Sequence, residues 1–222
     1  MTSEAPQDPS DRLIDQLASH LEPVRPIAGI PRMLAALASV IAVVAVAAFA
    51  GYGLRQDFWS GFVGNVTYAS VLVGLVLAVV GACTATLASV IPGRETLVRV
   101  GAGVAGVGLG LAILVAVGST PWATARFDAP LSQMTCILRG TVFATLPALA
   151  LLALAARGWS ARPEWTVGLG LLGTGAAGAL IVHLTCPAIE SLHVLCTHTS
   201  TPLLIAGALT AVLAPLMRHL AR

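Results

Sequence analysis

The sequence of 222 residues has few charged side chains and no lysine. Asp, Glu, Lys and Arg make up 10% of the chain, and all twelve basic residues are arginine. A soluble domain carries about 25% charged residues, so most of this chain cannot face water. Hydrophobic residues reach 57%, and the mean hydropathy is +0.89. The formal charge of only +2 gives no sign of a surface for direct nucleic-acid binding.

Long apolar stretches account for this composition. A hydrocarbon core about 30 Å thick needs about 20 apolar residues at a rise of about 1.5 Å each. Six stretches are long enough: Met33–Gly53, Phe62–Ile91, Val98–Ser119, Met134–Ala156, Trp165–Thr185 and Thr199–Met217. We therefore predict an all-α, polytopic membrane protein. Its bundle of six transmembrane helices occupies residues 33–222, after a short cytoplasmic N-terminal segment of residues 1–32.

The arginines are distributed unevenly between the segments that connect these stretches. If the N-terminus is inside, nine arginines lie on the cytoplasmic side and two lie outside. The inner set is Arg12, Arg25, Arg32, Arg94, Arg99, Arg157, Arg162, Arg218 and Arg222, and the outer set is Arg55 and Arg126. Because cytoplasmic segments of membrane proteins carry the excess of basic residues, we expect both termini in the cytoplasm.

Carboxylates are absent from the six stretches. Ionisable residues within spans usually mark transport routes, so their absence argues against a proton- or sodium-coupled transporter. Apart from Arg99, the second residue of the third stretch, Arg139 is the one strong charge within a span, near the external end of the fourth stretch. Its side chain either snorkels to the interface or anchors a polar cluster. A transporter or channel for a small solute or metal remains the alternative function.

Two matches to the pattern G-x-G-x-x-G, Gly101–Gly106 and Gly168–Gly173, lie inside apolar stretches. A dinucleotide site needs a preceding strand and a helix that opens at the glycines, so we reject that function. Small residues three or four apart instead let helix backbones approach closely in lipid. Gly106–Gly110 is such a match, and Gly170–Gly178 continues a small-residue face. We expect the third and fifth helices to be the central packing helices.

The four cysteines include no C-x-x-C pair. This absence counts against a thiol oxidoreductase, the third function considered, and we expect no enzymatic activity. Cys83 lies among apolar residues of the second stretch and is expected to be a packing thiol. Cys136, at the end of the fourth stretch, and Cys186 and Cys196, between the fifth and sixth, are expected on the external side.

Three histidines, His183, His193 and His198, accompany the external cysteines. In an oxidising periplasm a disulfide can form, either Cys136–Cys186 or Cys186–Cys196. Thiolate and imidazole are also ligands for zinc and other soft or borderline metals. The spacing matches no standard zinc pattern, so disulfide and metal chemistry both stay open. The candidate metal ligands are Cys136, His183, Cys186, His193, Cys196 and His198, and no other cofactor is expected.

The N-terminal 32 residues are polar and contain five prolines. Ser10 is suited to cap a helix, and apolar residues then recur at helical spacing. The helix should end near Glu22, because Pro23 restricts the residue before it. Helices this short are marginal in isolation. The segment is therefore either a disordered tail or a docking helix for a cytosolic partner.

The whole layout resembles the NrsF family of bacterial membrane anti-sigma factors. It is also similar to the membrane anti-sigma factors that control light-induced carotenoid synthesis. The resemblance covers nearly the full chain, most clearly from Cys136 onward. Besides the six spans, it is carried by Leu13–Leu21, Leu21–Pro26, Cys136–Arg139, Arg157–Pro163, His183–Pro187, His193 and His198.

The resemblance implies a function that composition does not show. Such a protein holds an extracytoplasmic-function sigma factor inactive at the bacterial inner membrane and releases it on a periplasmic stress signal. Cys136 and Cys186 match two cysteines linked to sensing, whereas Cys196 is extra to that pattern, so several disulfide pairings are open. We expect the sigma factor to bind Leu13, Ile14, Leu17, Leu21, Val24 and Arg25. The implied partners are that sigma factor and the lipid bilayer.

Overall fold

The structure, a computed structural model of the chain, describes residues 9–19, 27–123, 130–158, 160, 162–188 and 190–220. It does not describe the side chains of residues 9, 11, 130–132 and 214–220. Over the described residues the secondary structure is helical, without strands. Arg126, which belongs to an expected external loop, lies outside the described residues.

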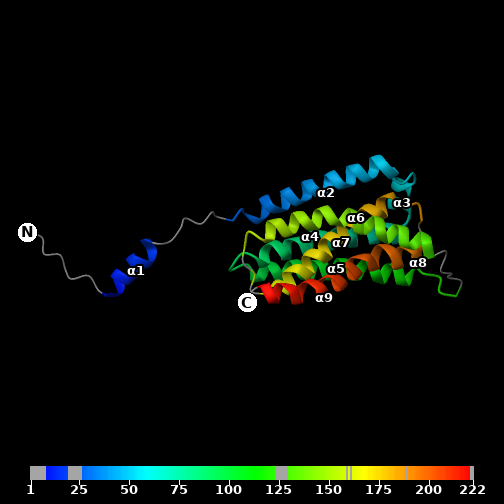
Figure 1. Cartoon of the computed structure of the whole chain (residues 1–222). Coiled ribbons are helices and arrows are strands. Elements are labelled where there is room, and N and C mark those ends of the chain that lie inside the picture. Colours follow the sequence, from blue (N-terminus) through cyan, green and yellow to red (C-terminus); the bar gives the residue numbers. More distant parts are fainter. Residues whose placement is uncertain are drawn as a thin grey trace, which may run out of the picture.

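Six long helical segments run side by side as a bundle (Figure 1). They are α2 (Ile30–Tyr52), α4 (Val66–Ser89), α5 (Glu95–Gly118), α6 (Pro130–Ala155), α7 (Pro163–Thr185), and a last segment of α8 (Ser191–His193), the π-helix η1 (Val194–Thr199) and α9 (Ser200–Leu220). Two short helices, α1 (Pro9–Ser19) and α3 (Phe58–Gly64), complete the described elements. The six segments are long and apolar enough to cross a membrane, which confirms the predicted fold class.

The second apolar stretch forms two helices, not the single long span expected over Phe62–Ile91. Asn65 leaves the helical conformation, with φ −123° and ψ 100°. Its side-chain Oδ1 accepts a hydrogen bond of 3.0 Å from the backbone N–H of Tyr68. This is an N-cap, which satisfies one of the donors that a helix start leaves free. The spanning helix α4 therefore has 24 residues, and α3 precedes it as a separate element.

The sixth span begins at Ser191, eight residues before the expected start at Thr199. The expected connection, from Cys186 to His198, shortens to residues 186–190. Hydroxyl groups explain how this polar segment becomes helical. Thr197 Oγ1 donates to His193 O at 2.6 Å, four residues earlier in the chain. Polar side chains that bond back to their own helix need no water.

The central helices of the bundle are α4 and α7. In their apolar parts 61% and 72% of residues are buried, against 33% in α5. The prediction that the fifth span is central is confirmed, because α7 lies between α4, α6 and α9. The same prediction for the third span is wrong, since α5 contacts the bundle chiefly through α4. The small-residue face Gly170–Gly178 packs on α4 and α6.

The α4–α5 interface is a close backbone contact between glycines. A Cβ atom on Gly108 would lie 2.5 Å from Gly74 O, and one on Gly101 would lie 2.7 Å from Gly81 O. The contacting glycines are thus seven residues apart on both helices. The expected pair, Gly106–Gly110, has no described atom within 4 Å of such a Cβ. Glycines do let α4 and α5 approach, but through a different face of α5.

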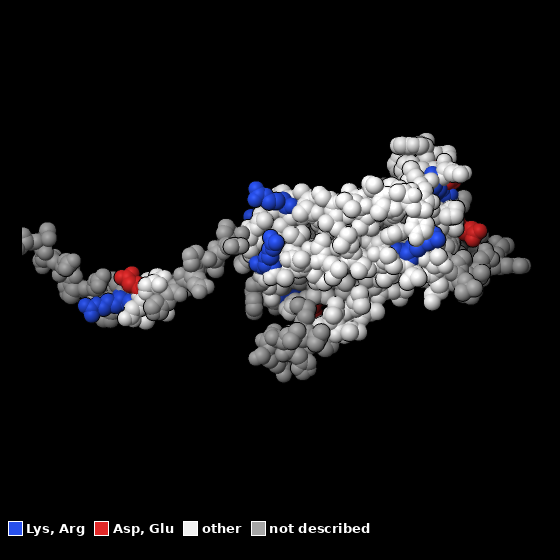
Figure 2. All heavy atoms as spheres, turned by 45° about the horizontal axis from the view of Figure 1, so that its top comes forward, with Lys and Arg blue, Asp and Glu red and all other residues white. Residues whose placement is uncertain are grey.

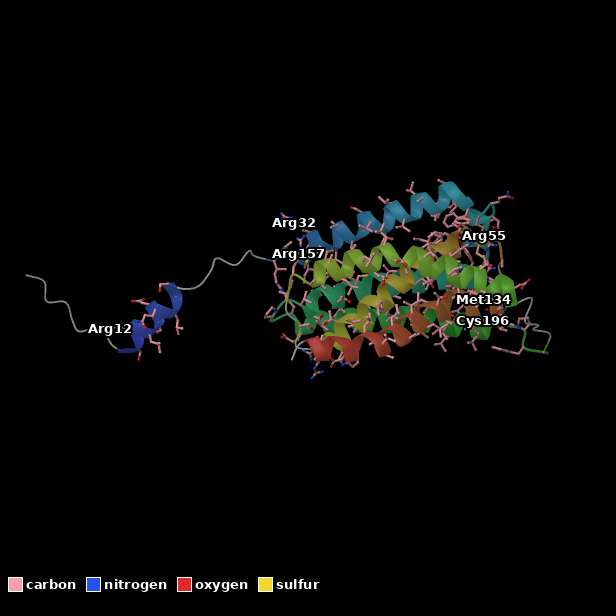
Figure 3. The ribbon with its side chains drawn as sticks, in the orientation of Figure 1. Arg12, Arg32, Arg55, Met134, Arg157 and Cys196 are labelled. Atoms are coloured by element: carbon pink, nitrogen blue, oxygen red, sulfur yellow. The ribbon has the colours of Figure 1, made fainter. Side chains whose placement is uncertain are left out.

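On the face shown in Figure 2, the arginines of the bundle gather toward its two ends. We call the end where α2 begins and α9 ends the terminal end, and the opposite end, with α3 and α8, the site end (Figure 1). Arg32 and Arg157 lie at the terminal end, and Arg55 lies at the site end (Figure 3). The chain thus enters and leaves the bundle at the same end.

Candidate functional site

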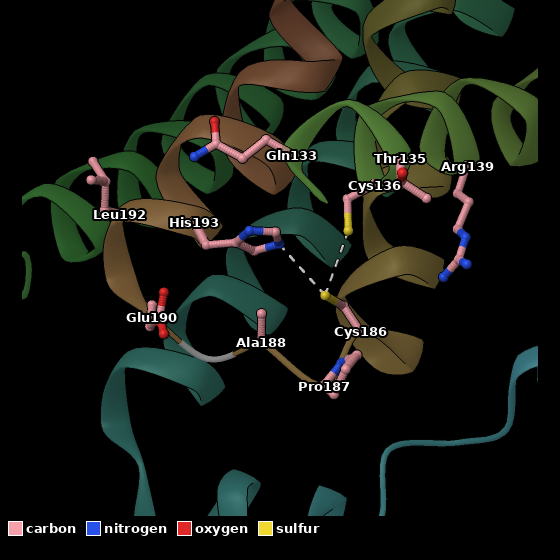
Figure 4. A pocket seen from close by; sticks show the side chains of 10 residues that line it. All are labelled: Gln133, Thr135, Cys136, Arg139, Cys186, Pro187, Ala188, Glu190, Leu192 and His193. Carbon is pink, nitrogen blue, oxygen red and sulfur yellow. Dashed lines mark hydrogen bonds between the residues drawn. The ribbon is translucent and has the colours of Figure 1, made fainter. Parts of the chain in front are cut away.

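Two cysteines and two histidines converge at the site end of the bundle. Cys136 comes from the second turn of α6, Cys186 directly follows α7, His193 closes α8 and His198 belongs to η1. The Sγ atoms of Cys136 and Cys186 are 3.7 Å apart, and Cys186 Sγ is 3.5 Å from His193 Nε2 (Figure 4). One ligand atom of each residue lies within 4.8 Å of the other three. We call these four residues the cysteine–histidine cluster.

The π-helix explains how His193 and His198 reach the same place. In an α-helix, with about 3.6 residues per turn, side chains five residues apart point about 140° away from each other. A π-helix forms i→i+5 hydrogen bonds, so residues five apart lie on nearly the same face. Val194–Thr199 adopts this form directly after His193. The local departure from α-helix therefore brings both imidazoles to Cys186.

His183 supports the cluster from inside the bundle. Its side chain is buried, its Nε2 lies 3.3 Å from the backbone O of Tyr68, and its Nδ1 lies 3.0 Å from His198 Nδ1. A carbonyl oxygen only accepts, so His183 carries its proton on Nε2. Burial favours neutral imidazole rings, so His183 Nδ1 is the acceptor and His198 Nδ1 is the donor.

This hydrogen-bond order leaves a lone pair on His198 Nε2. His198 is 1% exposed, and its Nε2 has no hydrogen-bond partner among the described residues. Most buried polar atoms in proteins are hydrogen-bonded, so a buried one without a partner calls for an explanation. The unpartnered nitrogen belongs to one of the four cluster residues.

A second layer joins the α2–α3 connection to His183. Arg55 is buried, and its backbone N–H donates to Leu184 O at 3.1 Å. Its guanidinium donates to both carboxylate oxygens of Asp57 and lies 5.1 Å from the centre of the Tyr68 ring. That ring stacks on His183 at 4.5 Å. The hydrogen bond from Arg55 holds the pKa of Asp57 below its usual range.

Arg55 and Tyr68 are the supporting residues that the sequence did not reveal. Each looks ordinary in the chain, one in a connecting segment and the other in a span. The one signal in the sequence is the pattern Arg55-x-Asp57, which is compatible with a local ion pair. An ion pair on a surface contributes little to stability and does not indicate a site. Their role comes from contacts between residues more than a hundred positions apart.

A cavity of about 500 Å³ lies beside the cluster. Cys136, Cys186 and His193 line it together with Arg139 and Glu190 (Figure 4). Arg139 lies one turn after Cys136 on α6, with its guanidinium 4.3 Å from the centre of the Tyr52 ring. Both expectations for Arg139, snorkelling to the interface and anchoring a polar cluster, stay predictions.

The cysteines fall into three environments, and all four are free thiols. Cys83 is buried among Met33, Leu87 and other apolar side chains, as expected for a packing thiol. Cys196 lies on η1 and is not one of the four cluster residues. At Cys186, hydrogen bonds to Cys136 and to His193 hold the thiol pKa below its usual range. The structure thus brings Cys136 and Cys186 together.

The N-terminal segment contains the predicted helix as α1. Leu13, Ile14 and Leu17 are 57%, 61% and 63% exposed on it. The other three residues expected to bind a sigma factor, Leu21, Val24 and Arg25, lie outside the described residues. The described part of the segment therefore presents an apolar face that the rest of the described chain leaves uncovered.

Comparison with known proteins identifies the family of the chain. The sequence matches the family NrsF, described as negative regulator of sigma F, over residues 17–219. Comparisons with curated proteins and with solved structures gave no match. The matched range contains the whole cysteine–histidine cluster and begins at Leu17, after Leu13 and Ile14. The chain is therefore a multi-pass membrane protein of the NrsF family of negative regulators of sigma F.

Proposed function

We propose that this protein is an anti-sigma factor of the bacterial inner membrane that holds an extracytoplasmic-function sigma factor and releases it on a periplasmic signal. The family match carries the regulatory function. The two-sided layout supports the signalling mechanism. The N-terminal segment joins the bundle at the terminal end, and the cysteine–histidine cluster lies at the site end (Figure 1). A regulatory family of this kind is not ordinarily enzymatic.

The N-terminal segment supplies the sigma-binding surface in this proposal. Leu13 and Leu17 are four residues apart, and Ile14 lies beside them, so the three side chains share one face of α1. An apolar helix face that is exposed in the unbound protein suits a groove on a partner. In the sequence Leu21 follows Leu17 by another four residues, and Val24 and Arg25 come next. We assign all three to the same sigma-binding surface.

The arginines support an orientation with the cluster in the periplasm. The described segments at the terminal end contain Arg32, Arg94, Arg99, Arg157 and Arg162, and those at the site end contain Arg55 and Arg139. Basic residues accumulate on the cytoplasmic side of membrane proteins. This orientation places the N-terminal segment where a sigma factor is found.

The paired thiols of Cys136 and Cys186 supply the sensor. They connect the start of α6 to the end of α7, so either a disulfide or a shared metal ion would fix these two helices relative to each other. A ligand shifts a conformational equilibrium only when it binds the two states differently. We infer that the geometry of the thiol pair differs between the sigma-bound and sigma-free bundles. Cys196 has no part in this pair.

The alternative of a solute transporter finds little support in the described residues. The large cavity is confined to the site end. Along the bundle, glycine contacts such as Gly74–Gly108 and Gly140–Gly178 bring α4, α5, α6 and α7 together. Helices whose backbones are in contact leave no room for a polar path between them.

The sigma-binding surface is tested with the full-length protein. We expect the tagged protein, purified in mild detergent from its own bacterium, to retain a sigma factor identifiable by mass spectrometry. Leu17→Glu places a charge on the apolar face of α1 and should abolish retention. Ser19→Glu adds the same charge on the opposite face and should retain the sigma factor.

Two outcomes would contradict the proposal at different points. If the unaltered protein retains no sigma factor, the anti-sigma function is wrong. If Leu17→Glu retains as much sigma factor as Ser19→Glu does, the function stands but the binding surface lies elsewhere.

A further inference from the structure

We propose that the cysteine–histidine cluster is a binding site for a divalent cation of the zinc class, with Cys136 Sγ, Cys186 Sγ, His193 Nε2 and His198 Nε2 as its four ligands. The regulatory meaning of this site rests on the proposed function. Cation binding itself does not depend on a sigma factor, so the two can be tested separately.

The distances in the cluster fit tetrahedral coordination. Zn–S bonds of about 2.3 Å and Zn–N bonds of about 2.0 Å place two sulfur ligands about 3.8 Å apart, and a sulfur and a nitrogen about 3.5 Å apart. The structure has 3.7 Å between the two Sγ atoms and 3.5 Å from Cys186 Sγ to His193 Nε2. The fourth ligand atom, on His198, lies within 4.8 Å of the others. The four side chains thus already surround a position of the right size.

His198 supplies the observation that points to a cation. The hydrogen bond to His183 Nδ1 requires the proton on His198 Nδ1, so the lone pair of Nε2 is free. That atom is buried and has no partner among the described residues. A metal-bound histidine commonly donates its other N–H to a fixed acceptor, which selects the tautomer. Here the acceptor is His183, held in turn by the Tyr68 carbonyl.

A disulfide between Cys136 and Cys186 would leave this nitrogen unexplained. The bond would join the two sulfurs and remove their protons, and neither sulfur could then donate to His198. A cation satisfies the lone pairs of both imidazoles and both thiolates together. The geometry therefore favours ligation over disulfide formation as the resting state of the cluster.

Charge and access also fit a divalent cation. Two thiolates balance its charge of +2, and the two histidines are neutral, so the occupied site carries no net charge. This matters because an unbalanced charge is costly near the hydrocarbon core. Cys186, His193 and His198 are buried, whereas Cys136 is partly exposed toward the 500 Å³ cavity. The cavity gives an ion a route to its ligands.

Cobalt titration of the full-length protein tests the site directly. Protein purified in detergent and stripped with a chelator should gain thiolate-to-cobalt charge-transfer bands and the intense visible bands of tetrahedral Co²⁺. Zinc should then displace the cobalt. Cys136→Ser and Cys186→Ser should each lose charge-transfer intensity, and His198→Ala should weaken binding. His183→Ala, which removes the supporting hydrogen bond, should weaken binding by about 10- to 100-fold.

Cys196→Ser is the matched control, because Cys196 lies between the two histidine ligands but outside the ligand set. It should keep the spectrum and affinity of the unaltered protein. A measurement without substitutions guards against variants that fail to fold. In the unaltered protein, zinc should protect Cys136 and Cys186 from alkylation, as read by mass spectrometry, and should leave Cys196 reactive.

The results separate this site from the proposed function. Protein that retains its sigma factor but shows no charge-transfer band overturns the cation site alone. Protein that binds cobalt as expected but retains no sigma factor overturns only the anti-sigma function. Equal loss of binding in Cys196→Ser and Cys136→Ser, or protection of Cys196 by zinc, shows that the ligand set is wrong.

Discussion

Two residues act on the cysteine–histidine cluster without belonging to it. His183 determines which nitrogen of His198 faces the cluster, because its own proton is committed to the Tyr68 carbonyl. Arg55 joins the α2–α3 connection to the end of α7 through Leu184 O. The geometry of the cluster thus depends on hydrogen bonds made one layer away from it.

Asp57→Asn tests this second layer. The Arg55 hydrogen bond lowers the pKa of Asp57, so the ionised carboxylate stabilises the folded state. By linkage, this contribution is fully present above the ordinary pKa of an aspartate and is lost as the pH falls through the lowered pKa. The unaltered protein should therefore unfold at a higher temperature than the variant at neutral pH.

Thermal unfolding in detergent across a pH series measures this difference, which should shrink on acidification. If the difference in unfolding temperature stays constant down to strongly acid pH, the charge of the carboxylate is not what stabilises the α2–α3 connection.

The candidate ligands show how far residue types alone lead toward a site. Six cysteines and histidines were candidates, and the structure groups four of them. Cys196 falls outside the group because η1 directs His193 and His198, not Cys196, toward Cys186. His183 has a supporting position because both its nitrogens have partners within the protein. Both distinctions depend on the local helix geometry. The spacing of five residues from His193 to His198, or of three from His183 to Cys186, does not reveal it.

At the scale of elements, the number of spans followed from hydropathy, but several of their boundaries did not. Length and apolar composition suffice to identify a spanning helix. The break at Asn65 depends on a side-chain cap, and the early start at Ser191 depends on hydroxyls that bond to carbonyls of their own helix. Both are local polar contacts that an average over about 20 residues cannot resolve.

The sequence predicted that glycines of α5 make close helix contacts, but it did not predict which glycines make them. Glycine occupies five positions between Gly101 and Gly110, and these point to several sides of the helix. A pattern of small residues therefore indicates close packing without selecting the face. The face that α4 contacts is the one through Gly101 and Gly108.

Gly108→Ala and Gly110→Ala test this register as a matched pair. A Cβ at residue 108 meets the backbone of Gly74, which cannot move aside as a flexible side chain can. Overpacking of this kind costs about 1–3 kcal/mol, so Gly108→Ala should lower the free energy of unfolding by that amount.

Gly110→Ala meets no described atom within 4 Å and should be neutral or slightly stabilising. Denaturation by SDS in mixed micelles, followed by circular dichroism, measures both. Equal destabilisation of the two variants would contradict the assigned interface.

On the scale of the whole molecule, the two ends of the bundle differ in chemistry. The terminal end carries most of the described arginines and both connections to the chain ends, and the site end carries the cysteine–histidine cluster and its cavity. Signalling across the bilayer needs the ends to face different compartments, so orientation is the property on which the proposed function depends.

Reporter fusions determine that orientation. Alkaline phosphatase fused after Gly64 or after Pro187, at the site end, should be active, because that enzyme matures only in the periplasm. Fusions after Arg94 or after Arg162, at the terminal end, should be inactive. Green fluorescent protein at the same four positions should give the opposite pattern. An inverted result would place the cluster in the cytoplasm and refute a periplasmic signal.

The π-helix η1 gives the cluster a mechanical connection to the far end of the protein. A π-helical turn is equivalent to one additional residue within an α-helix. If η1 became α-helical, α9 would rotate by about 100° and shift by about 1.5 Å relative to α8. The 21 residues of α9 would transmit that motion over about 30 Å, to the terminal end, where the N-terminal segment joins the bundle. Cation binding by four side chains at one membrane surface would then appear as a rotation of α9 at the other surface.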